Sequence, residues 1–135
     1  MTDLHAEPRT TLIREVRCSP AVTVEAAESL WEAWQLMFVS GLRHLAVIGD
    51  AGTVTGVLSD RVILTDLPLT EAHLSGRKVG DVMSRPGTVT TDMSMYDAAT
   101  AMARHAVEAV PVVGDDGRLR ALLTSSDLVA WVARS

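Results

Sequence analysis

The chain of 135 residues has the length of one compact domain, and its 47% of apolar residues is typical of a protein with a core. Its 17 acidic residues outnumber its 12 basic ones, so at a formal charge of −5 no surface for a nucleic-acid backbone is expected. No apolar run is long enough to cross a membrane, and the first eight residues lack the apolar segment of a secretory signal. Because Cys18 is the only cysteine, no disulfide within the chain is possible, and we expect a cytoplasmic protein.

The N-terminal part of the chain predicts a tail, a strand and a helix in that order. Residues 1–10 are expected to form a flexible tail, and a short strand is predicted over 22–24. The signature Ser29-x-x-Glu32 predicts a helix start, because serine accepts a bond from a free helical N–H and the acid complements the positive helix end. One apolar face of that helix is formed by residues at i, i+3, i+4 and i+7, namely Leu30, Ala33, Trp34 and Met37.

A hairpin and a second helix are predicted next. Two β-rich runs, 45–48 and 54–58, flank a Gly-Asp-x-Gly turn at 49–52, whose glycines permit the positive φ of a tight turn. Ser59 is a candidate N-cap for the helix that follows. Residues 66–78 contain proline, glycine and small polar residues, and this composition predicts a linker.

The same order of elements then returns 65 residues later. Ser29 to Leu64 can be placed over Ser94 to Val129 without a gap, and eight of these 36 pairs are identical, where chance gives roughly two. The identical pairs are Ser29/Ser94, Ala33/Ala98, Met37/Met102, Val47/Val112, Gly49/Gly114, Asp50/Asp115, Gly52/Gly117 and Leu58/Leu123. The second copy therefore predicts a strand over 88–90, a helix from Ser94, a hairpin over 110–123 and a helix from Thr124.

The duplication divides the chain into a first repeat, residues 11–65, and a second repeat, residues 79–135. A repeat of this size buries too little surface to be stable by itself, which explains why two arrive together. A short leading segment precedes a proline at the entry to each repeat, Ile13–Val16 before Pro20 and Val79–Met83 before Pro86.

The chain resembles a pair of CBS domains. The resemblance rests on Asp81-Val82-Met83-Ser84-Arg85-Pro86, Ala98-x-x-x-Met102, Val110-Pro111-Val112-Val113-x-Asp115-x-Gly117 and Thr124-x-x-Asp127, and covers residues 13–132. It implies an α+β fold of two tandem β-α-β-β-α repeats, packed through their sheets with pseudo-two-fold symmetry. It also implies clefts that bind adenosine-containing ligands, and a homodimer formed through helices of both repeats. The tryptophans Trp31, Trp34 and Trp131 suit either core packing or that dimer surface.

The resemblance assigns a ligand site to the Thr124-x-x-Asp127 turn. The carboxylate would hold ribose hydroxyls, since it only accepts hydrogen bonds and a vicinal diol offers two donors. The hydroxyl and the helix N-terminus would lie near phosphate. The alternative is that Thr124 and Asp127 only cap the helix. The full set of predicted ligand-binding residues is Thr124, Asp127, Thr88, Val89, Thr90, Val110, Pro111, Val112, Arg43 and His44.

The two repeats differ at this site. The first repeat has Ser59 and Val62 at the matching positions, so the ribose acceptor is missing there. Ala46 replaces Pro111, whose missing N–H leaves one ladder position of its strand unpaired. Arg43 and His44 are the candidate phosphate ligands, since their counterparts in the second repeat carry no positive charge.

Enzyme chemistry is not expected. The four histidines show no i, i+4 pair and there is no cysteine cluster, so metal-ligand spacing is absent, and no phosphate-binding glycine loop is present. We expect a regulatory module without an obligatory cofactor, which binds an adenine nucleotide or related adenosine compound and signals to an unknown protein in trans. The alternative is a ligand-free interaction module whose clefts are both degenerate.

Overall fold

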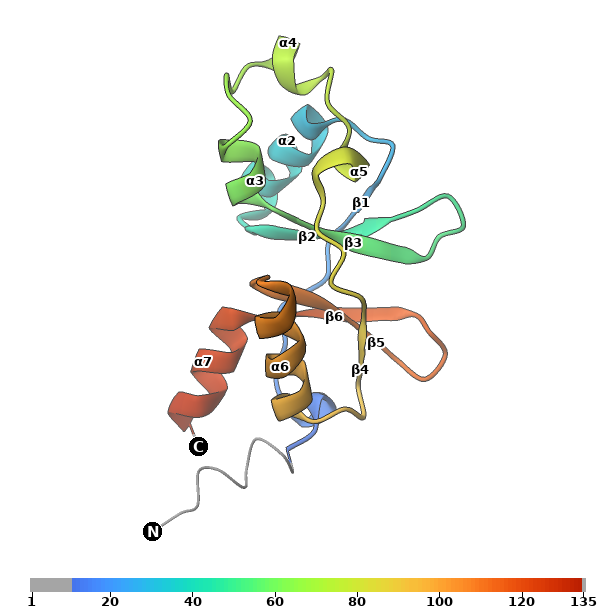
Figure 1. Cartoon of the computed structure of the whole chain (residues 1–135), viewed down its shortest axis with the longest axis vertical. Coiled ribbons are helices and arrows are strands. Elements are labelled where there is room, and N and C mark those ends of the chain that lie inside the picture. Colours follow the sequence, from blue (N-terminus) through green and yellow to red (C-terminus); the bar gives the residue numbers. More distant parts are fainter. Residues whose placement is uncertain (1–10, 135) are drawn as a thin grey trace. The chain divides into compact units, whose positions relative to one another are not determined.

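The computed structural model describes residues 11–134, so the tail predicted for residues 1–10 lies outside the described residues. The chain folds into two compact units, each with its own three-stranded sheet (Figure 1). The first unit comprises Val22–Arg85, and the second unit combines residues 11–21 with residues 86–134. The predicted α+β class is confirmed, and each unit contains one β-α-β-β-α repeat.

The first unit holds one parallel and one antiparallel strand pair. Its elements are β1 (Thr23–Glu25), α2 (Leu30–Ser40), β2 (His44–Ile48), β3 (Val54–Ser59), α3 (Asp60–Leu64), α4 (Glu71–Leu74) and α5 (Val79–Val82). The strand order is β1-β2-β3, with β1 parallel to β2 and β2 antiparallel to β3.

The second unit repeats this topology. Its elements are the 3-10 helix η1 (Ile13–Glu15), β4 (Val89–Thr90), α6 (Met95–His105), β5 (Ala109–Val113), β6 (Leu119–Thr124) and α7 (Ser125–Arg134). The order is β4-β5-β6, and the register is that of the first unit shifted by 65 residues, including the irregularity before the last β5 residue.

Both long helices begin at the predicted serines. The hydroxyl of Ser29 accepts a bond from the amide of Glu32 at 3.2 Å, and that of Ser94 accepts one from Asp97 at 3.0 Å. Each helix ends at a residue with a left-handed backbone, Gly41 after α2 and Ala106 after α6. Helices commonly end at a residue in this conformation. Both hairpins turn at a glycine with φ of +77°, so the predicted turns are confirmed.

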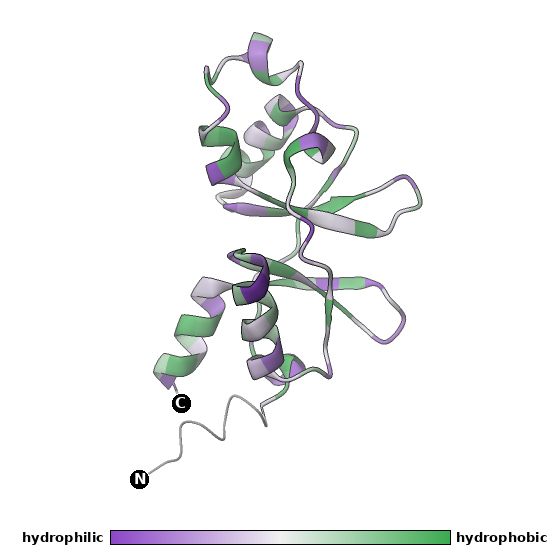
Figure 2. Cartoon of the chain, viewed as in Figure 1, coloured by the Kyte–Doolittle hydropathy of each residue, from purple (hydrophilic) through white to green (hydrophobic). Residues whose placement is uncertain are grey.

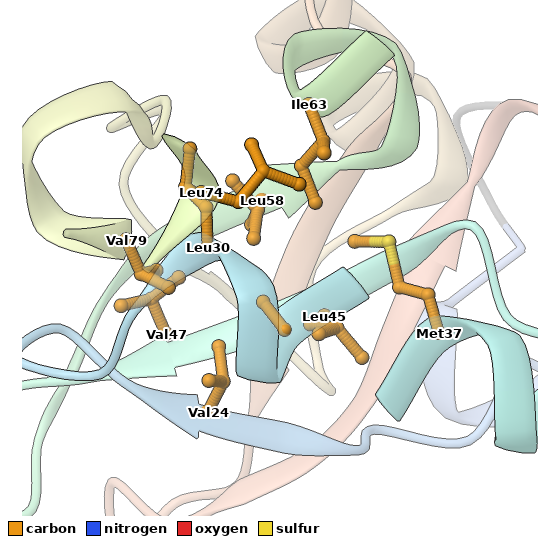
Figure 3. Packing of buried hydrophobic residues seen from close by; sticks show 10 residues of the cluster. Val24, Leu30, Met37, Leu45, Val47, Leu58, Ile63, Leu74 and Val79 are labelled. Carbon is orange, nitrogen blue, oxygen red and sulfur yellow. The ribbon is translucent and has the colours of Figure 1, made fainter. Parts of the chain in front are cut away.

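The segment that leads into each repeat packs in the unit of the other repeat. Ile13 is buried in the core of the second unit, and its amide donates to the carbonyl of Met93 at 2.9 Å. Val79 is buried in the core of the first unit, and its amide donates to the carbonyl of Glu28 at 2.9 Å (Figure 3). The two segments therefore make the same bonds in exchanged places.

Residues 66–78, predicted as a linker, contribute to the first core. They contain α4, and Leu74 is fully buried beside Leu30 and Leu58 (Figure 3). The tryptophans of α2 and α7 are half-buried and pack against the cores, Trp31 and Trp34 in the first unit and Trp131 in the second.

The parallel strands differ by one residue from the prediction, and Pro111 explains why β4 is the shorter. Strands were predicted over 22–24 and 88–90, whereas β1 begins at Thr23 and β4 at Val89. In the first unit the amide of Ala46 donates to the carbonyl of Val22 at 2.9 Å. Pro111 occupies the matching position and has no N–H, so that bond cannot form to Gly87, and Thr88 stays outside the strand.

A candidate ligand site at the start of the last helix

Thr124 and Asp127 bond each other across the first turn of α7. The Thr124 hydroxyl accepts a bond from the Asp127 amide at 3.1 Å, and Oδ2 of Asp127 accepts one from the Thr124 amide at 2.9 Å. This reciprocal pair satisfies two N–H groups that a helix start leaves free. The capping role proposed from the sequence is therefore observed, and Thr124 is buried while Asp127 is half-buried.

Ser19 completes the cluster from a distant part of the chain. Its amide lies 3.1 Å from Oδ2 of Asp127, and its hydroxyl lies 3.0 Å from Oδ2 and 3.1 Å from Oδ1. Two backbone bonds with Leu122, each 3.0 Å long, fix Ser19 along the edge of β6. Among residues 11–134, Oδ2 receives two backbone amides and shares the Ser19 hydroxyl with Oδ1, which receives nothing else, so Oδ1 retains capacity for a further donor.

Cys18 lies next to this cluster and carries an unreactive thiol. Burial, and secondly the negative charge of Asp127, raise the pKa of the Cys18 thiol to about 11. A thiol with such a pKa stays protonated near neutral pH and is a poor nucleophile. The thiol of Cys18 therefore supplies no nucleophile to this cluster near neutral pH.

The matching place in the first unit lacks the carboxylate. Ser84 bonds Val57 with the same backbone pair, at 2.9 Å in both directions, that Ser19 forms with Leu122. Ser59 caps α3 by accepting a bond from the amide of Val62 at 3.4 Å. Since Val62 stands where the second unit has Asp127 and packs against the first core, this place offers no acidic acceptor.

The strand residues predicted as ligand contacts lie on both faces of the second sheet. The side chains of Val89, Val110 and Val112 belong to the hydrophobic core, so only their backbone groups are available to a ligand. Pro111 is buried and opposes Leu122 in the ladder. The remaining two residues differ in exposure: Thr88 is exposed and Thr90 is half-buried. The hydroxyl of Thr90 donates to the carboxylate of Asp92.

The two basic candidates lie in the first unit. The side chain of Arg43 is 82% exposed, with Nε 4.0 Å from the carboxylate of Asp60. His44 is half-buried at the start of β2, opposite Ser59. The structure thus groups Thr124 and Asp127 together in the second unit, while Arg43 and His44 belong to the other unit.

Ser19 is the residue of this cluster that sequence reasoning missed. A signal for it was present, because Ser19 and Ser84 are separated by the same 65 residues as the identical pairs of the duplication. The spacing marks both serines as equivalent, but it does not say which helix each one contacts.

No helix among residues 11–134 is long and apolar enough to cross a membrane.

Comparisons with known proteins agree with this architecture. Residues 13–68 and 79–134 each match the CBS domain family. A homoserine O-acetyltransferase of Methanococcoides burtonii is 28% identical over 118 residues, which cover 87% of this chain and 23% of that protein. The chain spans between 22% and 24% of the length of three curated relatives, two homoserine O-acetyltransferases and one L-aspartate semialdehyde sulfurtransferase.

Two solved structures show the same fold. The CBS domain of a bacterial CNNM/CorC family Mg²⁺ transporter in complex with ATP superposes with a TM-score of 0.81 at 22% identity, covering 96% of this chain and 92% of that one. The CBS domain pair of protein MJ0100, in complex with 5-methylthioadenosine and S-adenosyl-L-methionine, gives 0.75 at 22% identity, covering 92% and 97%. The predicted resemblance is confirmed: this chain belongs to the CBS domain family and carries two CBS domains in tandem.

Proposed function

We propose that the chain is a regulatory module that binds an adenosine-containing ligand at Ser19, Thr124 and Asp127. The observation that carries the proposal is Oδ1 of Asp127, which receives only the shared Ser19 hydroxyl, at 3.1 Å. A ribose diol would donate to this oxygen, while Oδ2 stays bonded to the two backbone amides. The ligands named in the two related structures are ATP, 5-methylthioadenosine and S-adenosyl-L-methionine; all carry such a diol, which supports this ligand class.

Pro111 supports the same site from the sheet. Because it has no N–H, the carbonyl of Gly87 lacks the bond that its counterpart Val22 receives from Ala46 at 2.9 Å. That carbonyl suits the exocyclic amine of an adenine, which is a donor. The first unit has no such free carbonyl and no carboxylate at Val62, so we assign the ligand to the second unit.

Binding of the ligand would regulate a partner in trans. A ligand shifts a conformational equilibrium only by its difference in affinity between two states, so the partner must recognise the state that the nucleotide favours. We expect this regulation to take place in the cytoplasm, where the free thiol of Cys18 stays reduced. Besides that partner, a second copy of the chain would cover the exposed apolar side chains Phe38 and Val39 on α2 and Val129 and Val132 on α7 in a homodimer. Figure 2 shows hydrophobic stretches along the ribbon of α7.

Titration calorimetry with AMP, ADP, ATP, S-adenosylmethionine and NAD tests the ligand proposal. At least one ligand is expected to bind with a Kd below about 1 mM. The Asp127→Asn variant should weaken that ligand roughly 10- to 150-fold, the cost of a lost charge-assisted bond.

Asp97→Asn is the matched control. Asp97 occupies the same third helical position behind a capping residue, Ser94, in the same unit, and it is exposed. Its replacement should leave the affinity within about twofold. If no ligand binds in the wild-type chain, the nucleotide proposal is wrong and the chain is an interaction module. An equal loss in both variants would remove Asp127 from the site.

A further inference from the structure

The second unit contains a cavity of about 590 Å³ whose lining includes none of Ser19, Thr124 and Asp127. It lies between the leading segment and the hairpin of β5 and β6. Its polar lining residues are Arg14, Thr91, Asp115, Asp116 and Arg120. Its floor is apolar, because it is lined by Ile13, Val16, Cys18, Val112 and Ala121, and all five pack in or against the core of the second unit. The volume lies within the range of small-molecule sites, about 300–1,000 Å³.

The first unit fills the corresponding space with Met83. Met83 precedes Ser84 as Cys18 precedes Ser19, and the two serines make the same backbone pair. A Cβ atom placed on Gly56, the counterpart of Ala121, would lie 2.9 Å from the sulfur of Met83 and closer still to the carbonyl oxygen of Ser84. The methionine therefore lies directly on the glycine. The smaller thiol of Cys18 leaves this volume open in the second unit.

The polar lining of the cavity is also specific to the second unit. When residues of the two units are matched by their backbone bonds or by the 65-residue spacing, four lining positions carry different side chains. The pairs, second unit first, are Arg14/Gly80, Thr91/Ala26, Asp116/Ala51 and Arg120/Thr55. Asp115 is retained as Asp50 and so belongs to the hairpin turn common to both units. The changed positions carry two guanidinium groups, one carboxylate and one hydroxyl, a net charge of +1.

Arg120 is held in place at the rim. Its Nη2 lies 3.1 Å from Oδ2 of Asp116, and a Cβ atom on Gly114 would lie only 2.7 Å from its Nε. The same carboxylate is 3.8 Å from Arg118, so its charge is already compensated. Arg120 has five N–H donors and uses one in this pair, so donors remain for an anion. Arg14 supplies the second guanidinium, on the opposite, leading-segment side of the cavity.

We propose that this cavity binds a small carboxylic acid with an apolar, ring-sized body. The body would lie on the half-buried side chains of Val16, Cys18 and Ala121, and the carboxylate would bond the guanidinium groups of Arg14 and Arg120. A carboxylate matches the planar fork of arginine with two parallel bonds. Such a ligand differs from an adenosine compound, so the inference goes beyond the proposed function and does not depend on it.

NMR titration with 2-naphthoate, using 2-naphthylmethanol as the uncharged partner of the same shape, tests the proposal. Naphthoate should shift the amide signals of Arg14, Cys18, Gly114 and Ala121, and the alcohol should bind roughly tenfold more weakly or worse. Equal affinity of the two compounds would refute the carboxylate assignment. If naphthoate shifts other amide signals but leaves these four unchanged, the ligand binds elsewhere and the proposed cavity is wrong.

Variants separate the floor from the rim. Cys18→Met combined with Ala121→Gly copies the first unit and should abolish naphthoate binding while the circular dichroism and melting of the chain remain native. Arg14→Gln, an exposed change that keeps the core intact, should weaken naphthoate roughly tenfold and leave the alcohol within about twofold. Arg104→Gln, on the exposed side of α6, is the control and should change neither. Naphthoate binding with the affinity of the wild-type chain in either cavity variant overturns the proposal.

A competition titration distinguishes the two sites. Saturating amounts of any adenine nucleotide that binds should leave the naphthoate affinity within about twofold. Displacement of naphthoate by the nucleotide would show one shared site and would refute a separate one. If no nucleotide binds at all, the proposed function fails while the naphthoate titration still decides the cavity.

Discussion

The amide and the hydroxyl of Ser19 both donate to the carboxylate of Asp127, 108 residues further along the chain, over distances of 3.0 to 3.1 Å. This contact joins the leading segment to the first turn of α7. It also places the only acidic acceptor of the Thr124 turn beside a residue from the other end of the sequence. The start of the first repeat is thus a structural part of the second unit.

Ser19→Ala is expected to lower the free energy of unfolding by about 1 kcal/mol, because it removes a hydroxyl bond to a carboxylate while both backbone bonds remain. Urea denaturation followed by circular dichroism measures the change. Ser84→Ala is the matched control, since Ser84 has the same backbone bonds and the first unit has Val62 at the position equivalent to Asp127. Its effect should stay below about 0.5 kcal/mol. Equal losses in the two variants would contradict a specific bond between Ser19 and Asp127.

Ile13→Ala is expected to destabilise the second unit. The side chain is 1% exposed, and removing a buried isoleucine side chain costs about 2–5 kcal/mol. Hydrogen exchange should show lost protection at Val110 and Leu123 before Leu45 and Leu58, because Ile13 packs in the second core. Leu67→Ala, at a side chain 67% exposed, is the control and should have little effect. Loss of protection mainly at Leu45 and Leu58 would disprove the exchange of leading segments.

Pro111→Ala is expected to lengthen β4. The new amide should donate to the carbonyl of Gly87, as that of Ala46 donates to Val22 in the first unit. In two-dimensional NMR spectra the amide at position 111 should therefore exchange slowly with solvent, comparably to the amide of Ala46. A rapidly exchanging amide would show that something other than the missing N–H keeps Thr88 outside the strand. The same variant should weaken any bound adenine ligand, because the carbonyl is then occupied.

Cys18 is expected to resist alkylation below strongly alkaline pH. Burial and the charge of Asp127 raise its pKa to about 11, and only the thiolate reacts. The rate with iodoacetamide should therefore rise with pH to a midpoint near 11 in the folded chain. In the chain unfolded by urea, the midpoint should fall near the ordinary value of 9.0. Asp127→Asn should lower the folded midpoint, because the negative charge that opposes thiolate formation is gone; an unchanged midpoint would leave burial as the sole cause.

The sequence alone predicted the elements whose signals are local. Ser29 and Ser94 start helices because each hydroxyl reaches an amide three residues away, and Gly52 and Gly117 fix hairpin turns because they adopt positive φ. The duplication extended these signals to two β-α-β-β-α repeats. It also showed in advance that Val62 and Asp127 make the two helix starts unequal.

Only the tertiary structure decided which parts of the chain meet. The repeated order of elements marks the segments that begin at Ile13 and Val79 as leading segments, but this order is equally satisfied whether each segment packs on its own repeat or on the other. The exchange that is observed brings Ser19 to Asp127 and Cys18 to Ala121, and the bulk of Met83 opposite Gly56 closes in one unit the cavity that the other retains. Such contacts depend on side-chain volume and on bringing together residues more than 100 positions apart in the sequence. No local sequence pattern encodes either.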